Sequence, residues 1–117
     1  MKYDFIKLGN KNMAISFGFA ALRKYSELTN TSLSDLQKLG TDMTLNDTLI
    51  LLWCGIKDGH RRAKQEFELS VDDIADMLDG NFDVLEDAFE ILGRHMSDGL
   101  TNSEKKQVAK GTKKKKS

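Results

Sequence analysis

Few side chains in this sequence could carry out a reaction: there is one cysteine, Cys54, and there are two histidines, His60 and His95. Cys54 follows Trp53 in the most apolar stretch, where nothing nearby favours a reactive thiolate, so we interpret it as a small core residue. Neither histidine has a second ligand at metal-binding spacing, and we expect both to be solvated residues near helix ends. The sequence therefore predicts no catalytic, cofactor-binding or metal-binding residue.

The best metal candidate lies in a run of ten carboxylates that contains no Lys or Arg. Asp79, Asn81 and Asp83 occupy alternate positions. Glu90 follows Asp79 by eleven residues, so the four imitate the ligand spacing of a calcium-binding EF-hand loop. The sixth position of such a loop requires glycine, and here it is Val84. We interpret the carboxylates instead as helix-dipole partners and a solvated face.

The net charge of zero is the sum of two regions of opposite sign. Residues 1–100 hold 11 Lys+Arg and 17 Asp+Glu, which is −6, whereas residues 101–117 hold seven Lys and one Glu, which is +6. The second region has almost no apolar residues to offset about 1–2 kcal/mol of backbone ordering entropy per residue. We expect a folded acidic domain over residues 1–99 and a disordered basic tail over residues 100–117.

Apolar periodicity predicts a mainly α fold, a small helical domain of four to five helices with an N-terminal β-hairpin. Strict alternation at residues 3–8 and 13–18 indicates two strands, with a turn over residues 9–12. Ser32, Thr44 and Ser70 are predicted helix N-caps. The expected helices start at Phe19 and after these three caps, and the last runs from about Asn81 to Met96.

The helix that follows Thr44 is expected to be central and covered on several sides, because apolar residues extend around much of its circumference. Gly59 is expected near the end of this helix, although the basic residues that follow it could prolong the helix. The predicted buried faces also include large residues near helix ends, namely Phe19, Leu28, Leu45 and Phe82.

Several classes of protein are excluded by composition. The longest apolar run has eight residues, and a membrane span needs about 20. The N-terminus has no signal-peptide pattern, and one cysteine cannot form an internal disulfide. We expect one soluble intracellular domain with no membrane association.

The order of segments resembles a known family. The segments that carry the resemblance are residues 20–29 (AALRKYSELT), 51–57 (LLWCGIK) and 67–79 (FELSVDDIADMLD), preceded by the hairpin and followed by an amphipathic helix. Over about residues 5–97 the chain is similar to the tail assembly chaperones of long-tailed bacteriophages and related gene transfer agents. That family has no catalytic residues to transfer, so the resemblance implies a binding protein and not an enzyme.

The resemblance implies a role in viral morphogenesis in the host cytoplasm. Such chaperones coat the tape measure protein before the tail tube polymerises around it, and they are absent from the mature virion. A translational frameshift near the end of the reading frame often gives a longer form that recruits tail tube subunits, and Lys113–Lys116 lies where such a slip could occur. Members of the family can self-associate as homo-oligomers, and we expect the hairpin to contribute to such a contact.

For this function the helices would offer an apolar groove to an amphipathic helix of the partner. The candidate partner-binding residues are Leu49, Leu52, Trp53, Ile56, Phe82, Leu85 and Phe89. Each of these could instead belong to the core. Met43, Met77 and Met96 could line an adaptable surface, and the acidic face over residues 72–90 could guide basic partners.

The alternative is a small nucleic-acid-binding regulatory protein with a basic tail. The helices around Gly80 could form a helix-turn-helix, and the terminal lysines could contact phosphates. However, the second helix would carry four carboxylates before its first basic residue, Arg94, so phosphates would repel it. The tail has no aromatic residue for base stacking, so we expect only weak nucleic-acid binding from it.

Overall fold

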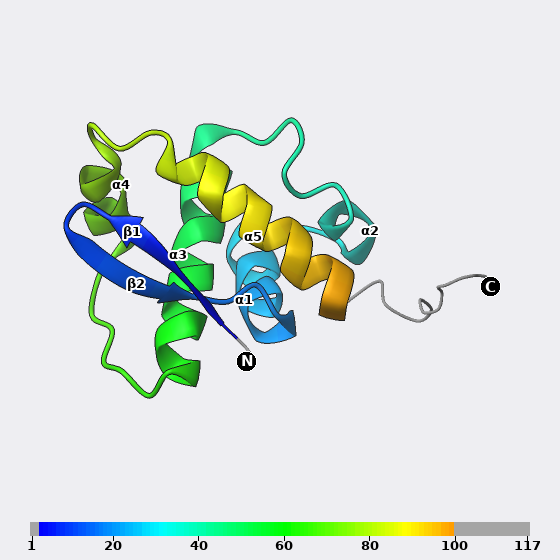
Figure 1. The fold of residues 1–117 in the computed structure, drawn as a ribbon. Helices are drawn as coiled ribbons and strands as arrows, with labels where there is room; N and C mark the ends of the chain where they lie inside the picture. The colour runs from blue at the N-terminus through cyan, green and yellow to red at the C-terminus, as the bar shows by residue number, and fades with distance from the viewer. Residues whose placement is uncertain (1–2, 100–117) are drawn as a thin grey trace.

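The computed structural model describes the backbone of residues 3–99 and the side chains of residues 3–97 (Figure 1). Within this range the order of elements is β1 (Asp4–Leu8), β2 (Lys11–Ile15), α1 (Phe19–Thr29), α2 (Leu33–Leu36), α3 (Leu45–Arg62), α4 (Val71–Leu78) and α5 (Val84–Gly99). The predicted fold class, mainly helical with an N-terminal antiparallel hairpin, is confirmed. The predicted basic tail, residues 100–117, lies outside the described residues.

The hairpin is tighter than the sequence predicted. β1 and β2 pair antiparallel with Asp4 opposite Ile15 and Leu8 opposite Lys11, so the turn is only residues 9–10 and not residues 9–12. Gly9 has a φ of 66°, the left-handed conformation that such short turns require. Ile6 and Leu8 are buried and Phe5 is exposed, as the predicted alternation requires.

α3 is the central element, as predicted, and α1, α4 and β2 all pack against it. In Figure 1 the hairpin crosses in front of α3. Two glycines one turn apart, Gly55 and Gly59, form the contact, and Gly55 O accepts a hydrogen bond of 2.9 Å from the Ser16 amide. Gly59 lies within the last turn of α3, as predicted, and the basic residues that follow it extend the helix to Arg62.

α5 lies along β1 and is fixed to the hairpin by a histidine. Nδ1 of His95 accepts a hydrogen bond of 3.0 Å from the Phe17 amide. Since Nδ1 accepts, the hydrogen is on Nε2, which donates to Oδ2 of Asp4 at 2.8 Å. His95 therefore joins the first strand, the segment after the second strand and the last helix, and the prediction that it is a solvated residue is wrong.

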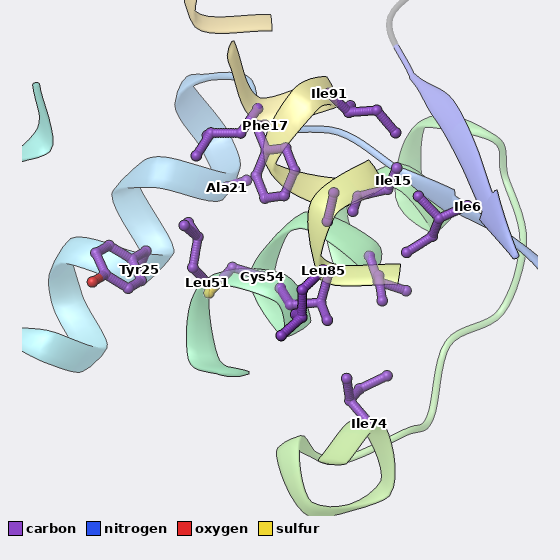
Figure 2. Packing of buried hydrophobic residues seen from close by; sticks show 14 of the residues in the cluster. Ile6, Ile15, Phe17, Ala21, Tyr25, Leu51, Cys54, Ile74, Leu85 and Ile91 are labelled. Carbon is purple, nitrogen blue, oxygen red and sulfur yellow. The ribbon is translucent and has the colours of Figure 1, made fainter. Parts of the chain in front are cut away.

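The core collects side chains from both strands and all five helices. Figure 2 labels members from the hairpin, α1, α3, α4 and α5. Among its most enclosed members are Leu8, Ile15, Phe17, Leu22, Leu51, Ile56 and Ile74. Four residues that we assigned to buried faces are exposed instead, namely Phe19 (61%), Leu28 (48%), Leu45 (66%) and Phe82 (74%). Phe19, Leu28 and Leu45 are in terminal turns, where neighbouring elements do not cover them, and Phe82 precedes α5 and is not part of it.

The helix starts follow the predicted caps. The hydroxyls of Ser32, Thr44 and Ser70 each accept a hydrogen bond from the backbone amide three residues later. At Ser70 the carboxylate of Asp73 also accepts from the Ser70 amide, which completes a capping box. Three helix boundaries differ from the prediction: α2 already ends at Leu36, and α5 begins at Val84 and continues to Gly99.

Candidate functional site

The seven candidate partner-binding residues fall into three groups. Leu52, Ile56 and Leu85 are 3%, 0% and 8% exposed and belong to the core. Leu49, Trp53 and Phe89 are half-buried, and Phe82 is exposed. In this conformation a partner could reach Phe82 fully and the half-buried three in part.

The outward face of α3 is covered by the chain that follows it, residues 65–70. Nε1 of Trp53 donates a hydrogen bond of 2.8 Å to the carbonyl of Leu69, and the Trp53 ring lies 6.2 Å from the ring of Phe67, centroid to centroid. Nζ of Lys57 lies 5.4 Å from the Trp53 centroid. Trp53 thus anchors this segment, which fills much of the surface that the sequence offered to a partner.

The space between α3 and α5 is also filled. A cavity of about 10 Å³ lies there, lined by Phe17, Thr48, Leu51, Leu52, Leu85, Ala88 and Phe89. Such a volume is of the order of one water-sized probe and has no room for an inserted side chain. Of the candidate residues near this space, Leu49 and Phe89 are half-buried, and Phe82, which precedes α5, is exposed.

A much larger concavity lies between α1 and the second half of α3, and we call it the α1–α3 groove. Its volume is about 530 Å³, and it is lined by Ala20, Ala21, Arg23, Lys24, Cys54, Lys57, Asp58, Arg61, Gln65 and Phe67. Exposed Ala20 and half-buried Phe67 give it an apolar surface, and four long basic side chains complete most of its lining. The volume is within the range of about 300–1,000 Å³ that is typical of ligand sites.

Two of the basic side chains at the groove, Lys24 and Lys57, form no ion pair with any carboxylate of the described residues. Lys57 instead lies over aromatic rings, with Nζ 6.0 Å from the centroid of Phe67. The third, Arg23, is 4.0 Å from Glu27 in an exposed pair that contributes little. The groove therefore presents positive charge to whatever enters it.

Asp58 holds the fourth basic side chain in place. Its carboxylate is 6% exposed and lies 2.7 Å from Nη2 of Arg61 and 2.7 Å from Nε of Arg62. A buried carboxylate needs such compensation, and two guanidinium groups on one carboxylate leave a positive surplus. This cluster fixes the end of α3 that borders the groove.

Cys54 contributes its side chain to the groove lining but is 2% exposed. Burial raises the pKa of its thiol from 9.0 to about 12, although the charges of Lys24 and Lys57 act in the opposite direction. The thiol is therefore protonated near neutral pH, where the thiolate is the nucleophilic form. The interpretation of Cys54 as a core residue agrees with its burial.

His60 is buried, so the prediction that it is solvated is wrong. Its exposed fraction is 7%, its Nδ1 donates a hydrogen bond of 2.8 Å to the Ile56 carbonyl, and its ring lies 5.1 Å from that of Phe67. It borders a second cavity of about 470 Å³, between the start of β2 and residues 65–69. The sequence did not predict this burial, because it depends on residues 65–70 folding back along α3 and placing Phe67 beside His60.

The spacing that imitates an EF-hand loop has a structural explanation. Nδ2 of Asn81 donates to the Met77 carbonyl at 3.1 Å, so this amide closes the end of α4. Gly80 has a φ of 78°, which ends the helix. Among the described residues, no three His, Cys, Asp or Glu side chains gather in a way that could hold a metal ion.

Sequence reasoning missed the basic residues of the α1–α3 groove. Lys57 and Arg61 are four positions apart and so lie on one face of α3, a spacing that is visible in the sequence. Arg23 and Lys24 are adjacent on α1, but nothing local shows that α1 lies beside this face of α3. The groove exists only because these two helices pack together.

Within residues 3–99, no helix has both the length and the apolar character needed to cross a membrane. Comparison of the chain with protein-family models, with curated proteins and with solved structures finds no match.

Proposed function

We propose that this protein is a bacteriophage tail assembly chaperone that binds a helical stretch of the tape measure protein and keeps it soluble during tail assembly. The resemblance of residues 5–97 to that family supports the proposal. The structural observation that carries it is the α1–α3 groove, an open concavity of about 530 Å³ with an apolar surface on a small helical body.

The groove suits the binding of a helix. Amphipathic helices bind by placing apolar anchor side chains in a groove between elements of the partner. Ala20 is exposed and small, so the backbone of a bound helix can approach α1 closely at this point. Phe67 is half-buried and offers an aromatic surface for an anchor side chain.

The chemistry of the groove favours binding over catalysis. Its one thiol, Cys54, is buried with a raised pKa, and Asp58 is engaged by two guanidinium groups. Neither side chain is presented as a nucleophile or a base to a molecule in the groove. The exposed ring of Phe82, with half-buried Leu49 and Phe89, is a second candidate contact for the same long partner.

Co-expression tests the proposal. The partner is the longest predominantly helical chain encoded in the same genome, and the measurements are its soluble fraction and its co-elution with this protein. We expect the partner to be soluble only with the chaperone. Ala20→Trp, which places a large ring in the groove, should abolish co-elution, whereas Gln37→Trp on the exposed end of α2 should not. A partner that stays insoluble and never co-elutes would overturn the proposal.

The proposal also places the protein in the host cytoplasm and outside the mature virion. Mass spectrometry of purified particles should find the tape measure protein and not this chain. In lysates of infected cells, peptides that continue past Lys113–Lys116 in another reading frame would reveal the longer form that recruits tail tube subunits. If the chain is present in finished particles in amounts comparable to the tape measure protein, it is a structural component instead.

A further inference from the structure

We infer that the α1–α3 groove selects an acidic amphipathic helix, a segment in which an apolar anchor is flanked by Asp or Glu side chains. This inference rests on the proposed function and specifies the chemistry of the partner segment. The charges at the groove and the shape of its lining carry it.

The groove concentrates positive charge in an acidic body. Residues 1–100 carry 11 Lys+Arg and 17 Asp+Glu, yet four of those basic side chains line this one concavity beside a single carboxylate, Asp58. Asp58 is itself shared between Arg61 and Arg62. Lys24 and Lys57 have no carboxylate partner among the described residues, so a bound carboxylate would be their first.

The two lysines come from opposite sides of the groove, Lys24 from α1 and Lys57 from α3. The ammonium group of Lys57 lies over the rings of Trp53 and Phe67, with Nζ 5.4 Å and 6.0 Å from their centroids. This packing restricts the side chain before a partner arrives and lowers the entropy that binding must remove. An anchor that enters between the walls would bring its flanking carboxylates toward both ammonium groups.

A nucleic acid fits the same charges less well. Duplex DNA carries a charge every 1.7 Å or so along its axis and needs a continuous basic track. Here the positive charges are interrupted, because Glu27 lies 4.0 Å from Arg23 and exposed Glu66 and Glu68 flank Phe67 in the sequence. An acidic helix avoids this conflict, since its carboxylates are few and can be spaced around the anchor.

The inference is tested on the full chain with two synthetic helical peptides of about five turns. They share one apolar pattern and differ only in the residues beside the anchor, which are Glu in one peptide and Lys in the other. Fluorescence of Trp53, the single tryptophan, and backbone amide shifts report binding. We expect the Glu peptide to bind at least roughly tenfold more tightly than the Lys peptide at low salt, and to weaken as salt is added. The amide shifts should be centred on residues 20–24 and 54–61.

Matched variants show whether the groove or the terminal lysines bind the peptide. Every variant keeps the terminal lysines, so a difference between variants reports on the groove. Lys24→Glu with Lys57→Glu should weaken the Glu peptide at least roughly tenfold. Lys7→Glu with Lys38→Glu changes the net charge equally at exposed positions outside the groove and should leave binding unchanged. If the Lys24→Glu, Lys57→Glu double variant unfolds, Lys24→Gln with Lys57→Met removes the two charges, keeps unbranched side chains at both positions and should still weaken binding.

Each other outcome overturns the inference. Equal binding of the two peptides, or loss of binding in both double variants alike, would mean that the groove does not select carboxylates. If a DNA oligonucleotide binds more tightly than the Glu peptide and shifts the same amides, the groove is a nucleic-acid site. If the molecular mass of the protein in solution doubles with concentration, and only when the groove is intact, the groove is a self-association site. If the tape measure protein co-elutes equally with the Lys24→Glu, Lys57→Glu double variant, the proposed function stands and this inference fails.

Discussion

Gly59 of α3 lies directly against the backbone of Ile15 in β2. A Cβ atom at Gly59 would overlap the amide nitrogen and the Cα of Ile15, and one at Gly55 would lie 2.5 Å from Cε1 of Phe17. The two glycines are four residues apart on one face of the helix, so they form a flat strip along it. The hairpin and the segment that follows it rest on this strip, which fixes them to the centre of the fold.

Gly59→Ala should therefore destabilise the protein strongly. The methyl group meets backbone, which cannot turn aside as a side chain can, so the strand must shift, and we expect a loss of about 3 kcal/mol or more in the free energy of unfolding in urea. Gly93→Ala is the matched control, because Gly93 is exposed in α5 and nothing lies within 4 Å of the place that its new methyl group would take. It should raise stability by about 0.5–1 kcal/mol. Similar effects of the two substitutions would contradict this account.

His95→Ala should cost about 1–3 kcal/mol, because the Phe17 amide loses its acceptor and Asp4 loses a donor. Arg94→Ala removes only an exposed contact to Asp4 at 3.4 Å and should cost less than about 1 kcal/mol. Nitrogen NMR of the wild-type imidazole should show the hydrogen on Nε2. A hydrogen on Nδ1, or equal costs of the two substitutions, would exclude the bridge described above.

Alkaline pH should weaken the fold through Cys54. Burial raises the pKa of this thiol to about 12 in the folded state, whereas the unfolded chain loses the proton near 9.0. Between these values the unfolded state binds fewer protons than the folded state, so stability falls as pH rises, by at most about 1.4 kcal/mol per pH unit. The pKa of Tyr25 is also raised, chiefly by burial, and adds to the loss above its usual 10.0.

Cys54→Ala isolates the cysteine contribution. Urea unfolding at a series of pH values from 8 to 10.5 or so should give a shallower decline in this variant than in the wild type. Tyr25 is present in both proteins, and the charge of Cys54 is the smallest of the causes that raise the Tyr25 pKa, so the comparison reports chiefly on the buried thiol. Parallel declines would show that the buried thiol has no part in the alkaline loss of stability.

Phe82 and Ile56 were both candidate partner-binding residues, and their opposite burial separates their roles. Ile56→Ala should cost about 2–5 kcal/mol, because Ile56 is fully buried. Phe82→Ala should change stability by no more than about 0.5 kcal/mol, because the ring is 74% exposed. In the co-elution assay, Phe82→Ala should weaken partner binding while its thermal unfolding stays at the wild-type temperature. Unchanged binding would remove Phe82 from the partner surface.

Local sequence was sufficient for most element boundaries. Ser32, Thr44 and Ser70 cap the helices that they were predicted to start, and Asn30, with a φ of 58°, ends α1. These features depend on contacts between residues three or four positions apart, which a sequence displays directly. The alternation that buries Ile6 and Leu8 is equally local, because successive residues of a strand point to opposite faces.

Sequence alone could not decide which part of each apolar stripe is covered. Phe19 and Leu45 continue helical stripes but remain exposed, whereas the polar side chains of His60 and His95 are buried and half-buried. His95 and the Phe17 amide are 78 positions apart, and no local pattern predicts that they meet. The partner-binding candidates divided in the same way: residues 65–70 cover Trp53, whereas Leu52 and Leu85 are buried where α3 meets α5.

The chain by itself determined that there would be a hairpin, a set of capped helices and an apolar helix at their centre, because those properties follow from backbone geometry and near neighbours. Only the tertiary structure brought Lys24 of α1 and Lys57 of α3 to one groove. Their proximity depends on how two helices pack, and that packing is decided by many weak contacts made across the whole core.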